Sequence, residues 1–435
     1  MSKIRLHGTS SGYTEIAPVA ASGNNTLTLP NDGTIISKDS NGAVGVTSVV
    51  TTTATITTAK VGAAVTISES GIEASGIGIT CANINGGQIS GRRNLIINGA
   101  MQVAQRATSA TGKNSTGYYC TDRFRLVDYN IGTFTLAQQT SAPTGFNKSL
   151  RLDCTTADTS IAAADYLSID QAIEGFDLQQ LDYGLSSAKT ITISFYVKST
   201  TTGTYTLEIY MNNGDYFNSK TYTISSANTW ERKIITFVGN TSNGITNDNT
   251  RGLTCNFWLS NGSNFEGGTF SDGTWHNTTN RRVHSSQVNI ASSTDNDWSI
   301  TGVQLEVGSQ ATAFEQRSFN EEIVLCQRYY EKSYNHGDVP GTNTSNGSVM
   351  FLSNRNSGTP HTMLRYATRK RAAPTLVAYA TGAADTTGMK NLDANTVYSN
   401  YIMNRNGEMG CTAYPDATPV IGQFIQFHYT ADAEL

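Results

Sequence analysis

The sequence predicts a mainly β chain whose central part is a β-sandwich. Residues 191–197 and 205–211 alternate between apolar and polar side chains, which is the period of a strand with one buried face. Asn213-Gly214 and Asn261-Gly262 are turn-forming pairs between such segments. Charged residues make up 15% of the chain, below the ~25% of an ordinary soluble domain. Alternation, turns and composition therefore all favour strands with a surface rich in hydroxyls and amides.

The last strand of the sandwich is predicted at residues 298–307, with a β-bulge at Gly302. Trp298 and Ile300 share one face of a strand. Val303 and Leu305 lie on that same face only if Gly302 shifts the register, which is what a β-bulge does. The sequence therefore predicts a kinked strand.

A linking helix is predicted over residues 318–333. Ser318 and Glu321 have the spacing of a capping box, in which two side chains satisfy amides left unpaired at a helix start. Apolar residues follow at helical intervals and form one stripe: Phe319, Ile323, Cys326 and Tyr330.

The other predicted segments are residues 1–91, 92–317 and 334–435: an extended N-terminal shaft, the sandwich, and a C-terminal β-domain. The first of these has almost no aromatic residues after Tyr13, too few large side chains for a core of its own. Burial against identical chains would stabilise it, so we expect an intertwined oligomer. A disordered linker rich in Thr and Gly is the alternative.

The net charge, the cysteine spacing and the apolar runs of the chain exclude several classes of partner and site. The net charge of −4 gives no basic field for nucleic acid or for an anionic membrane. The six cysteines show no metal-type spacing and are expected to be buried free thiols. The start lacks an apolar leader and no run is long enough to cross a bilayer, so we expect assembly in the cytoplasm without membrane insertion.

Sequence motifs give little support for catalysis. There is no Gly-x-Ser-x-Gly, and none of the six histidines lies in a zinc-binding motif. Acidic residues are frequent between 158 and 182, including Asp170 and Glu174, and are interpreted as a solvated edge rather than a glycosidase pair. We therefore expect no catalytic residues, no cofactor and no metal ligands.

Binding is better supported by the residues present. Sugars are held by contact with aromatic rings and by hydrogen bonds from amides and hydroxyls. Trp275 lies in a Gly- and Ser-rich loop, where its ring stacks on a glycan or, as an equal alternative, closes the sandwich core. The candidate ligand-binding residues are Trp275, His276, Asn277, Tyr398, Tyr401 and Tyr414.

One basic cluster lies in the C-terminal domain. It consists of Arg365, Arg369, Lys370 and Arg371. A charged strand end is the first interpretation, and contact with an acidic polysaccharide of a cell surface is the other.

Several separated blocks occur in one order along the chain: residues 93–106 (RNLIINGAMQVAQR), 173–175 (IEG), 193–199 (ISFYVKS), 303–308 (VQLEVG), 311–315 (ATAFE) and 326–332 (CQRYYEK). Together they resemble bacteriophage tail fibre and receptor-binding virion proteins, and the similarity covers roughly half of the chain. Tyr183 stands where the family has a Trp.

The resemblance implies a jelly-roll sandwich similar to carbohydrate-binding modules, within a homotrimeric fibre located in the virion tail. Its partners would be tail or other virion proteins, through the N-terminal segment, and polysaccharide of the host surface. Weak sites on a symmetric fibre would reinforce one another through effective concentration. The alternatives are a spike that depolymerises polysaccharide and a purely architectural head or tail protein.

Analytical ultracentrifugation of the intact chain tests the oligomer directly. We expect a mass of about three chains, because residues 1–91 are predicted to be shielded from water only between copies. A single, fully ordered chain in that measurement would contradict the fibre interpretation.

Overall fold

The computed structural model describes residues 91–270, 272–354 and 360–435, together with five short strands nearer the start of the chain. The chain divides into two compact units, Met1–Thr80 and Cys81–Leu435. In the first unit, β1 (Ile4–His7) pairs with β2 (Tyr13–Ile16), and β3 (Thr58–Val61), β4 (Val65–Ser68) and β5 (Gly71–Ala74) form a second antiparallel sheet. Most of the predicted shaft lies outside the described residues, so its intertwining and the predicted domain boundaries stay predictions.

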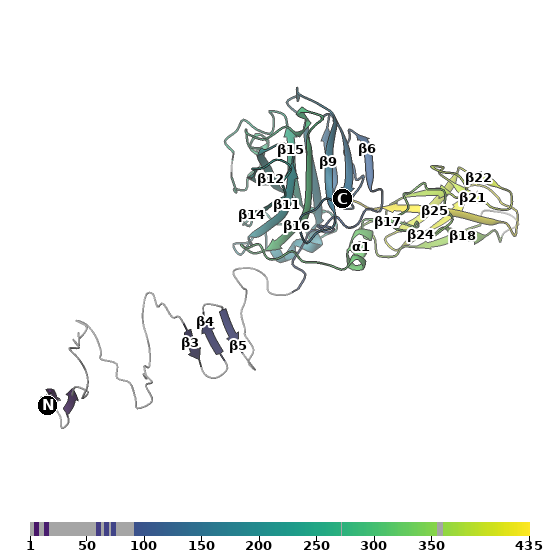
Figure 1. Cartoon of the computed structure of the whole chain (residues 1–435). Helices are drawn as coiled ribbons and strands as arrows, with labels where there is room; N and C mark the ends of the chain where they lie inside the picture. Colours follow the sequence, from purple (N-terminus) through teal and green to yellow (C-terminus); the bar gives the residue numbers. More distant parts are fainter. Residues whose placement is uncertain are drawn as a thin grey trace. The chain divides into compact units, whose positions relative to one another are not determined.

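Two antiparallel sheets form the predicted sandwich in the second unit (Figure 1). The five-stranded sheet has the order β13 (Tyr216–Ile224), β12 (Gly203–Met211), β15 (Arg251–Asn261), β10 (Tyr166–Glu174) and β7 (Arg125–Tyr129). The six-stranded sheet has the order β14 (Glu231–Phe237), β11 (Ile191–Ser199), β16 (Asp297–Val307), β9 (Ser149–Thr156), β8 (Thr133–Gln139) and β6 (Ser109–Lys113).

The strand pairs are nested, which makes this sandwich a jelly roll. β9 pairs with β16 and β11 with β14 in one sheet, while β10 pairs with β15 and β12 with β13 in the other. From the outermost pair to the innermost, successive pairs alternate between the two sheets, as a folded antiparallel ribbon requires. The predicted fold class and the jelly-roll topology are confirmed.

The core of the sandwich is built from every second residue of the strands. Apolar side chains of β10, β12 and β15 face those of β9, β11 and β16 in one buried cluster. On β15, for example, Leu253, Cys255, Phe257 and Leu259 are all fully buried in this cluster. The residues between them therefore point to the outer face of the five-stranded sheet.

The predicted bulge at Gly302 is confirmed. Ser194 and Tyr196 on β11 pair with Gln304 and Thr301 on β16, so two residues of β16 oppose one of β11. Gly302 has φ +63°, in the left-handed region that favours glycine. The shift places the predicted residues on one face, and all four are fully buried: Trp298, Ile300, Val303 and Leu305.

The helix begins as predicted but ends earlier. α1 spans Phe319–Gln327, with the Ser318–Glu321 capping box formed in both directions. The predicted apolar stripe is wrong at Tyr330, which belongs to β17 (Tyr330–Lys332) and pairs with β25 (Phe424–Asp432). The chain leaves the helix because the backbone finds a sheet partner there. Phe319 is also largely exposed.

The C-terminal domain consists of two small sheets (Figure 1). In the larger one, β25 pairs with β17, β18 (Val349–Leu352), β20 (Thr375–Ala380) and β21 (Met389–Asn391), which in turn pairs with β22 (Thr396–Tyr398). The smaller one has the order β19 (Thr362–Arg365), β24 (Gly410–Pro415) and β23 (Tyr401–Gly407). The three short 3₁₀ helices of the sandwich are Gly175–Leu181, Thr279–Arg281 and Ile290–Ser292.

Buried ion pairs join this domain and the end of the linking helix to the sandwich. Arg328 binds Glu174 of β10 through two hydrogen bonds of 2.6 Å. Arg123 pairs with Glu434, and Arg106 pairs with Asp432 at 2.9 Å. Because these charges are mostly buried, losing one partner would leave the other uncompensated, so the two domains are held firmly together.

The cysteines behave as predicted where they are described. The buried free thiols are Cys120, Cys154, Cys255, Cys326 and Cys411. Cys81 lies outside the described residues. Among the described helices, none is both long and apolar enough to cross a membrane.

Gly302→Ala is expected to destabilise the sandwich. The left-handed backbone costs about 1–2 kcal/mol in a non-glycine residue, and a Cβ would lie 2.6 Å from the Cζ of Phe146. Gly112→Ala is the matched control, because Gly112 has φ +64° and no described atom lies within 4 Å of its added Cβ. Urea unfolding should show the larger loss for Gly302→Ala. Equal losses would contradict a role for the Phe146 contact.

Candidate functional site

The predicted loop residues Trp275, His276 and Asn277 take three different positions. The indole N–H of Trp275 donates to the Val238 carbonyl at 2.8 Å, and its ring lies edge-on to Tyr183 against the sandwich core. His276 is buried and its backbone bridges to Phe217. Asn277 is exposed and lines a groove on the five-stranded sheet. The position of Trp275 therefore matches the interpretation in which its ring closes the sandwich core.

The predicted tyrosines of the C-terminal domain do not gather at one point. Tyr398 and Tyr401 are half-buried and pack against the core of that domain. The hydroxyl of Tyr398 accepts from Asn391 at 3.0 Å. Tyr414 lies on the other face of the small sheet, where its hydroxyl accepts from Asn404 at 3.1 Å.

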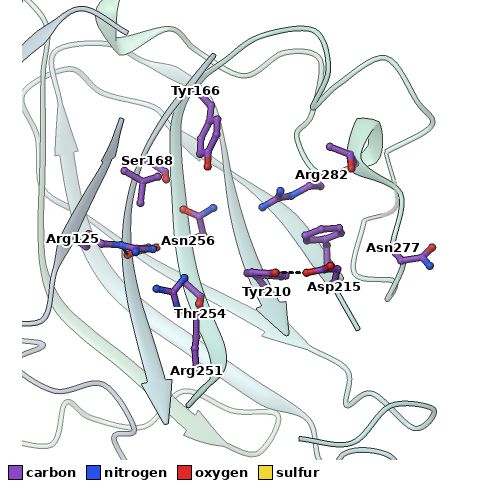
Figure 2. A pocket seen from close by; sticks show the side chains of 14 residues that line it. Arg125, Tyr166, Ser168, Tyr210, Asp215, Arg251, Thr254, Asn256, Asn277 and Arg282 are labelled. Carbon is purple, nitrogen blue, oxygen red and sulfur yellow. Dashed lines mark hydrogen bonds and ion pairs between the residues drawn. The ribbon is translucent and has the colours of Figure 1, made fainter. Parts of the chain in front are cut away.

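A groove of about 460 Å³ crosses the outer face of the five-stranded sheet (Figure 2). Strands β7, β10, β15, β12 and β13 supply most of its lining, the turn between β12 and β13 supplies Asp215, and the loop after β15 supplies the rest. The lining residues are Arg125, Val127, Tyr166, Ser168, Asp170, Tyr210, Asp215, Phe217, Arg251, Thr254, Asn256, Asn277, Thr279 and Arg282.

The floor of this groove carries polar atoms without partners. Ser168 lies on β10, and Thr254 and Asn256 lie on the neighbouring strand β15. All three residues are more than nine-tenths buried, yet the two hydroxyls and the Asn256 Oδ1 have no hydrogen-bond partner among the described residues. A buried polar atom left unpaired is costly, so these atoms mark a place for a polar ligand or water.

Two bidentate ion pairs flank the floor. Arg125 donates to both carboxylate oxygens of Asp170 at 3.0 and 2.6 Å, and Arg282 donates to both oxygens of Glu208 at 2.8 and 2.7 Å. Burial by itself lowers the pKa of Arg125, but the charge and hydrogen bonds of Asp170 outweigh burial and raise it. Burial and the nearby charge of Arg125 lower the pKa of Arg251.

Aromatic rings form the walls. Tyr166 stacks on the exposed Tyr129 with ring centroids 4.8 Å apart, and Tyr210 stacks on Phe217 at 5.2 Å. Burial, followed by the hydrogen bond to Asp215, raises the pKa of Tyr210 to about 12, so its hydroxyl stays protonated at neutral pH. Figure 2 shows Tyr166 and Tyr210 on opposite sides of Asn256.

Most of this groove was missed by motif analysis. Asp170 and Glu174, which were predicted to belong to a solvated edge, are buried and paired with arginines. The prediction failed because Asp170 and Glu174 point to the outer face of β10. The loop after β15 and the C-terminal domain cover this face. The sequence did contain one indication of the groove. The two-residue period of the strands places Ser168, Thr254 and Asn256 on the same, outer face of the sheet.

Among the described residues, no cluster of His, Cys, Asp and Glu side chains is arranged to hold a metal ion. The carboxylates at the groove each have a fixed partner. Asp170 and Glu208 bind arginines, and Asp215 accepts from the Tyr210 hydroxyl.

Comparisons with known proteins give only distant similarities. No protein-family model matches the chain, and neither does any curated protein. Among solved structures, the enzymatically active domain of tailspike protein 4 of bacteriophage CBA120 is 13% identical with a TM-score of 0.27, over 49% of this chain and 21% of that one. The similarity thus spans about a fifth of the tailspike chain.

Two sugar-related structures are similar at the same level. A putative sugar binding protein from Bacteroides thetaiotaomicron is 11% identical with a TM-score of 0.28, over 49% of this chain and 100% of that one. A family 16 carbohydrate binding module is 10% identical with a TM-score of 0.22, over 39% and 84% of the two chains.

His276 gives the loop beside the groove a pH dependence. Burial lowers the pKa of its imidazole below the ordinary 6.5, and the charge of Arg281 lowers it further. The folded chain then binds fewer protons than the unfolded chain, so stability is lost as the pH falls below about 6.5 toward the folded value. In His276→Asn, which keeps an acceptor for the Thr278 amide, unfolding free energy should depend less on pH across this window. Parallel pH profiles for both proteins would contradict the shift.

Proposed function

We propose that this chain is a polysaccharide-binding virion protein, a phage tail fibre that attaches to the host surface, and that the groove on the five-stranded sheet is a saccharide site. The observation that supports the site most directly is its floor, with three buried and unpaired polar atoms beneath aromatic walls. A sugar supplies hydroxyls that both donate and accept, together with an apolar ring face for aromatic contact.

The chemistry of the floor suits a polyol better than an apolar ligand. The free acceptor of Asn256 and the hydroxyls of Ser168 and Thr254 lie on adjacent strands, which are about 4.8 Å apart. A pyranose ring carries hydroxyls on neighbouring carbons and can satisfy groups on two strands at once. Each such hydrogen bond would give a partner to a buried polar atom that otherwise has none. Removing one of these atoms should therefore lower the affinity for the saccharide.

The charges favour a neutral saccharide at this groove. The guanidinium groups of Arg125 and Arg282 are neutralised by Asp170 and Glu208, and Arg251 donates to a Leu435 oxygen. An acidic sugar would compete with bonds already formed. Both oxygens of Asp170 and of Glu208 accept hydrogen bonds from these arginines, which favours binding over an acid or nucleophile role at these two positions.

The tail fibre proposal is supported by the sequence blocks, and a jelly-roll sandwich is the fold that their resemblance implies. In a homotrimer, three grooves on one fibre would bind a repeating polymer together, and weak single sites would then give firm attachment through effective concentration. A depolymerase, in contrast, would release soluble oligosaccharides from the host envelope. A purely architectural protein would leave adsorption unchanged when it is removed.

Thr254→Val tests the groove. The substitution removes an unpaired buried hydroxyl and nearly keeps the shape, so stability should be unchanged or higher. Affinity for the saccharide should fall by about 1 kcal/mol, or roughly fivefold. Neutral polysaccharides that bind the intact protein on a glycan array serve as ligands, and isothermal titration measures the change.

Thr121→Val is the matched control. Thr121 is also buried with an unpaired hydroxyl, but it lies outside the groove lining. It should reproduce the stability result without any loss of affinity. If both variants bind as tightly as the parent protein, the saccharide does not occupy this floor.

A further inference from the structure

The outer face of the small sheet in the C-terminal domain is exposed and carries a different set of residues. Leu364 on β19 and Cys411 and Ala413 on β24 point into the domain core. The residues between them point outward, and Met363 pairs with Thr412, which in turn pairs with Asn404 of β23. Met363 is 67% exposed. Among the described residues, no layer covers this face of the three-stranded sheet.

Two hollows lie on this face and share residues. One, of about 270 Å³, is lined by Met363, Arg365, Arg405 and Met409, among others. The second, of about 530 Å³, includes Met363, Arg405 and Tyr414. Arg405 therefore lines both hollows, as Met363 and Thr412 also do.

Neither arginine of this face has a carboxylate partner in the part of the chain that the structure describes. Arg365 and Arg405 are exposed, and no acidic side chain lies within 4.0 Å of either among the described residues. No carboxylate lines either hollow. Two guanidinium groups without counter-charge make this face positive, in contrast to the neutral groove on the sandwich.

The neighbouring basic residues are engaged elsewhere. Arg369 pairs with Glu408 at 2.8 Å, and Lys370 is buried against Glu331 at 2.6 Å. Arg371 donates to carbonyls of Asn249 and the C-terminal segment. Of the basic cluster found in the sequence, Arg365 is the member with no such partner within the described ranges.

The backbone at Arg405 is unusual in a way that fits a binding site. Its φ is +51°, and the pairing of β23 with β24 is irregular between Asn404 and Gly407. A non-glycine residue in the left-handed region costs free energy, and such residues are concentrated at functional positions. The irregularity brings Arg405 to the same hollow as Arg365, which lies on the opposite edge strand of the sheet.

We propose that this face is a second binding site, which takes the anionic group of an acidic polysaccharide. Arg365 and Arg405 would hold the carboxylate or phosphate, and Met363 and Tyr414 would contact the sugar rings. Arginine forms short, charge-assisted bonds with both groups, so the shared chemistry is an anionic oxygen pair on a saccharide. The net charge of −4 argues against a nucleic acid, which needs many phosphate contacts.

The test uses the full-length protein and three immobilised polymers: polygalacturonate for carboxylate, phosphomannan for phosphate, and dephosphorylated mannan as the neutral polymer. We expect binding to at least one acidic polymer and weakening as salt is raised from 50 to 300 mM. Arg365→Gln combined with Arg405→Gln should weaken that binding by about tenfold or more, since two charge-assisted contacts are lost. The corresponding double lysine variant should recover part of it.

Two controls separate this site from the proposed groove. Arg369→Gln removes an exposed arginine that already has a partner, and it should leave binding nearly unchanged. Thr254→Val should affect a neutral ligand of the groove and not the acidic polymer. The proposal is overturned if neither acidic polymer binds, or if the double glutamine variant binds as the parent does. Loss of the neutral ligand with Thr254→Val would still support the groove in that case.

Discussion

The two-residue period of β10 and β15 is the constraint on which the rest of the structure depends. One set of side chains, including Leu253, Phe257 and Ile169, must close the core between two sheets. The side chains of the other set must then point to the outer face, because successive side chains of a strand point to opposite faces. Because that face is partly covered by the loop after β15, some of its polar atoms are buried without a hydrogen-bond partner among the described residues. The unpaired floor of the groove thus follows from the way in which the sandwich closes.

The C-terminal segment extends this constraint to the second domain. Residues 432–434 bring two carboxylates against Arg106 and Arg123 of the sandwich, and Arg328 reaches Glu174 on the same side. Buried charges of this kind contribute little net stability but strongly disfavour separation, because each would be left uncompensated. The groove of the sandwich and the small-sheet face with Arg365 and Arg405 therefore belong to the same compact unit, Cys81–Leu435. A polymer with both neutral and acidic sugars would meet two chemistries on the same chain.

Sequence reasoning succeeded where the signal is local and failed where partners come from afar. The bulge at Gly302 and the cap at Ser318 are set by neighbouring residues, and both are present. Tyr330 was assigned to the helix because its spacing fits, but the hydrogen bonds of β25 lie in another part of the chain. Glu174 was interpreted as solvated for the same reason, since Arg328 is distant in the sequence. Neither partner can be inferred from spacing.

The sequence by itself determined the β class, the turns, the kinked last strand and the start of the helix, because each depends on residues close together in the chain. Only the tertiary structure decided which polar residues share a face, which charges are neutralised and which remain free. Arg365 and Arg369 look alike in the sequence, yet only Arg369 has a carboxylate within reach among the described residues. That difference arises because electrostatic pairing depends on distance in space, and the sheet register sets that distance.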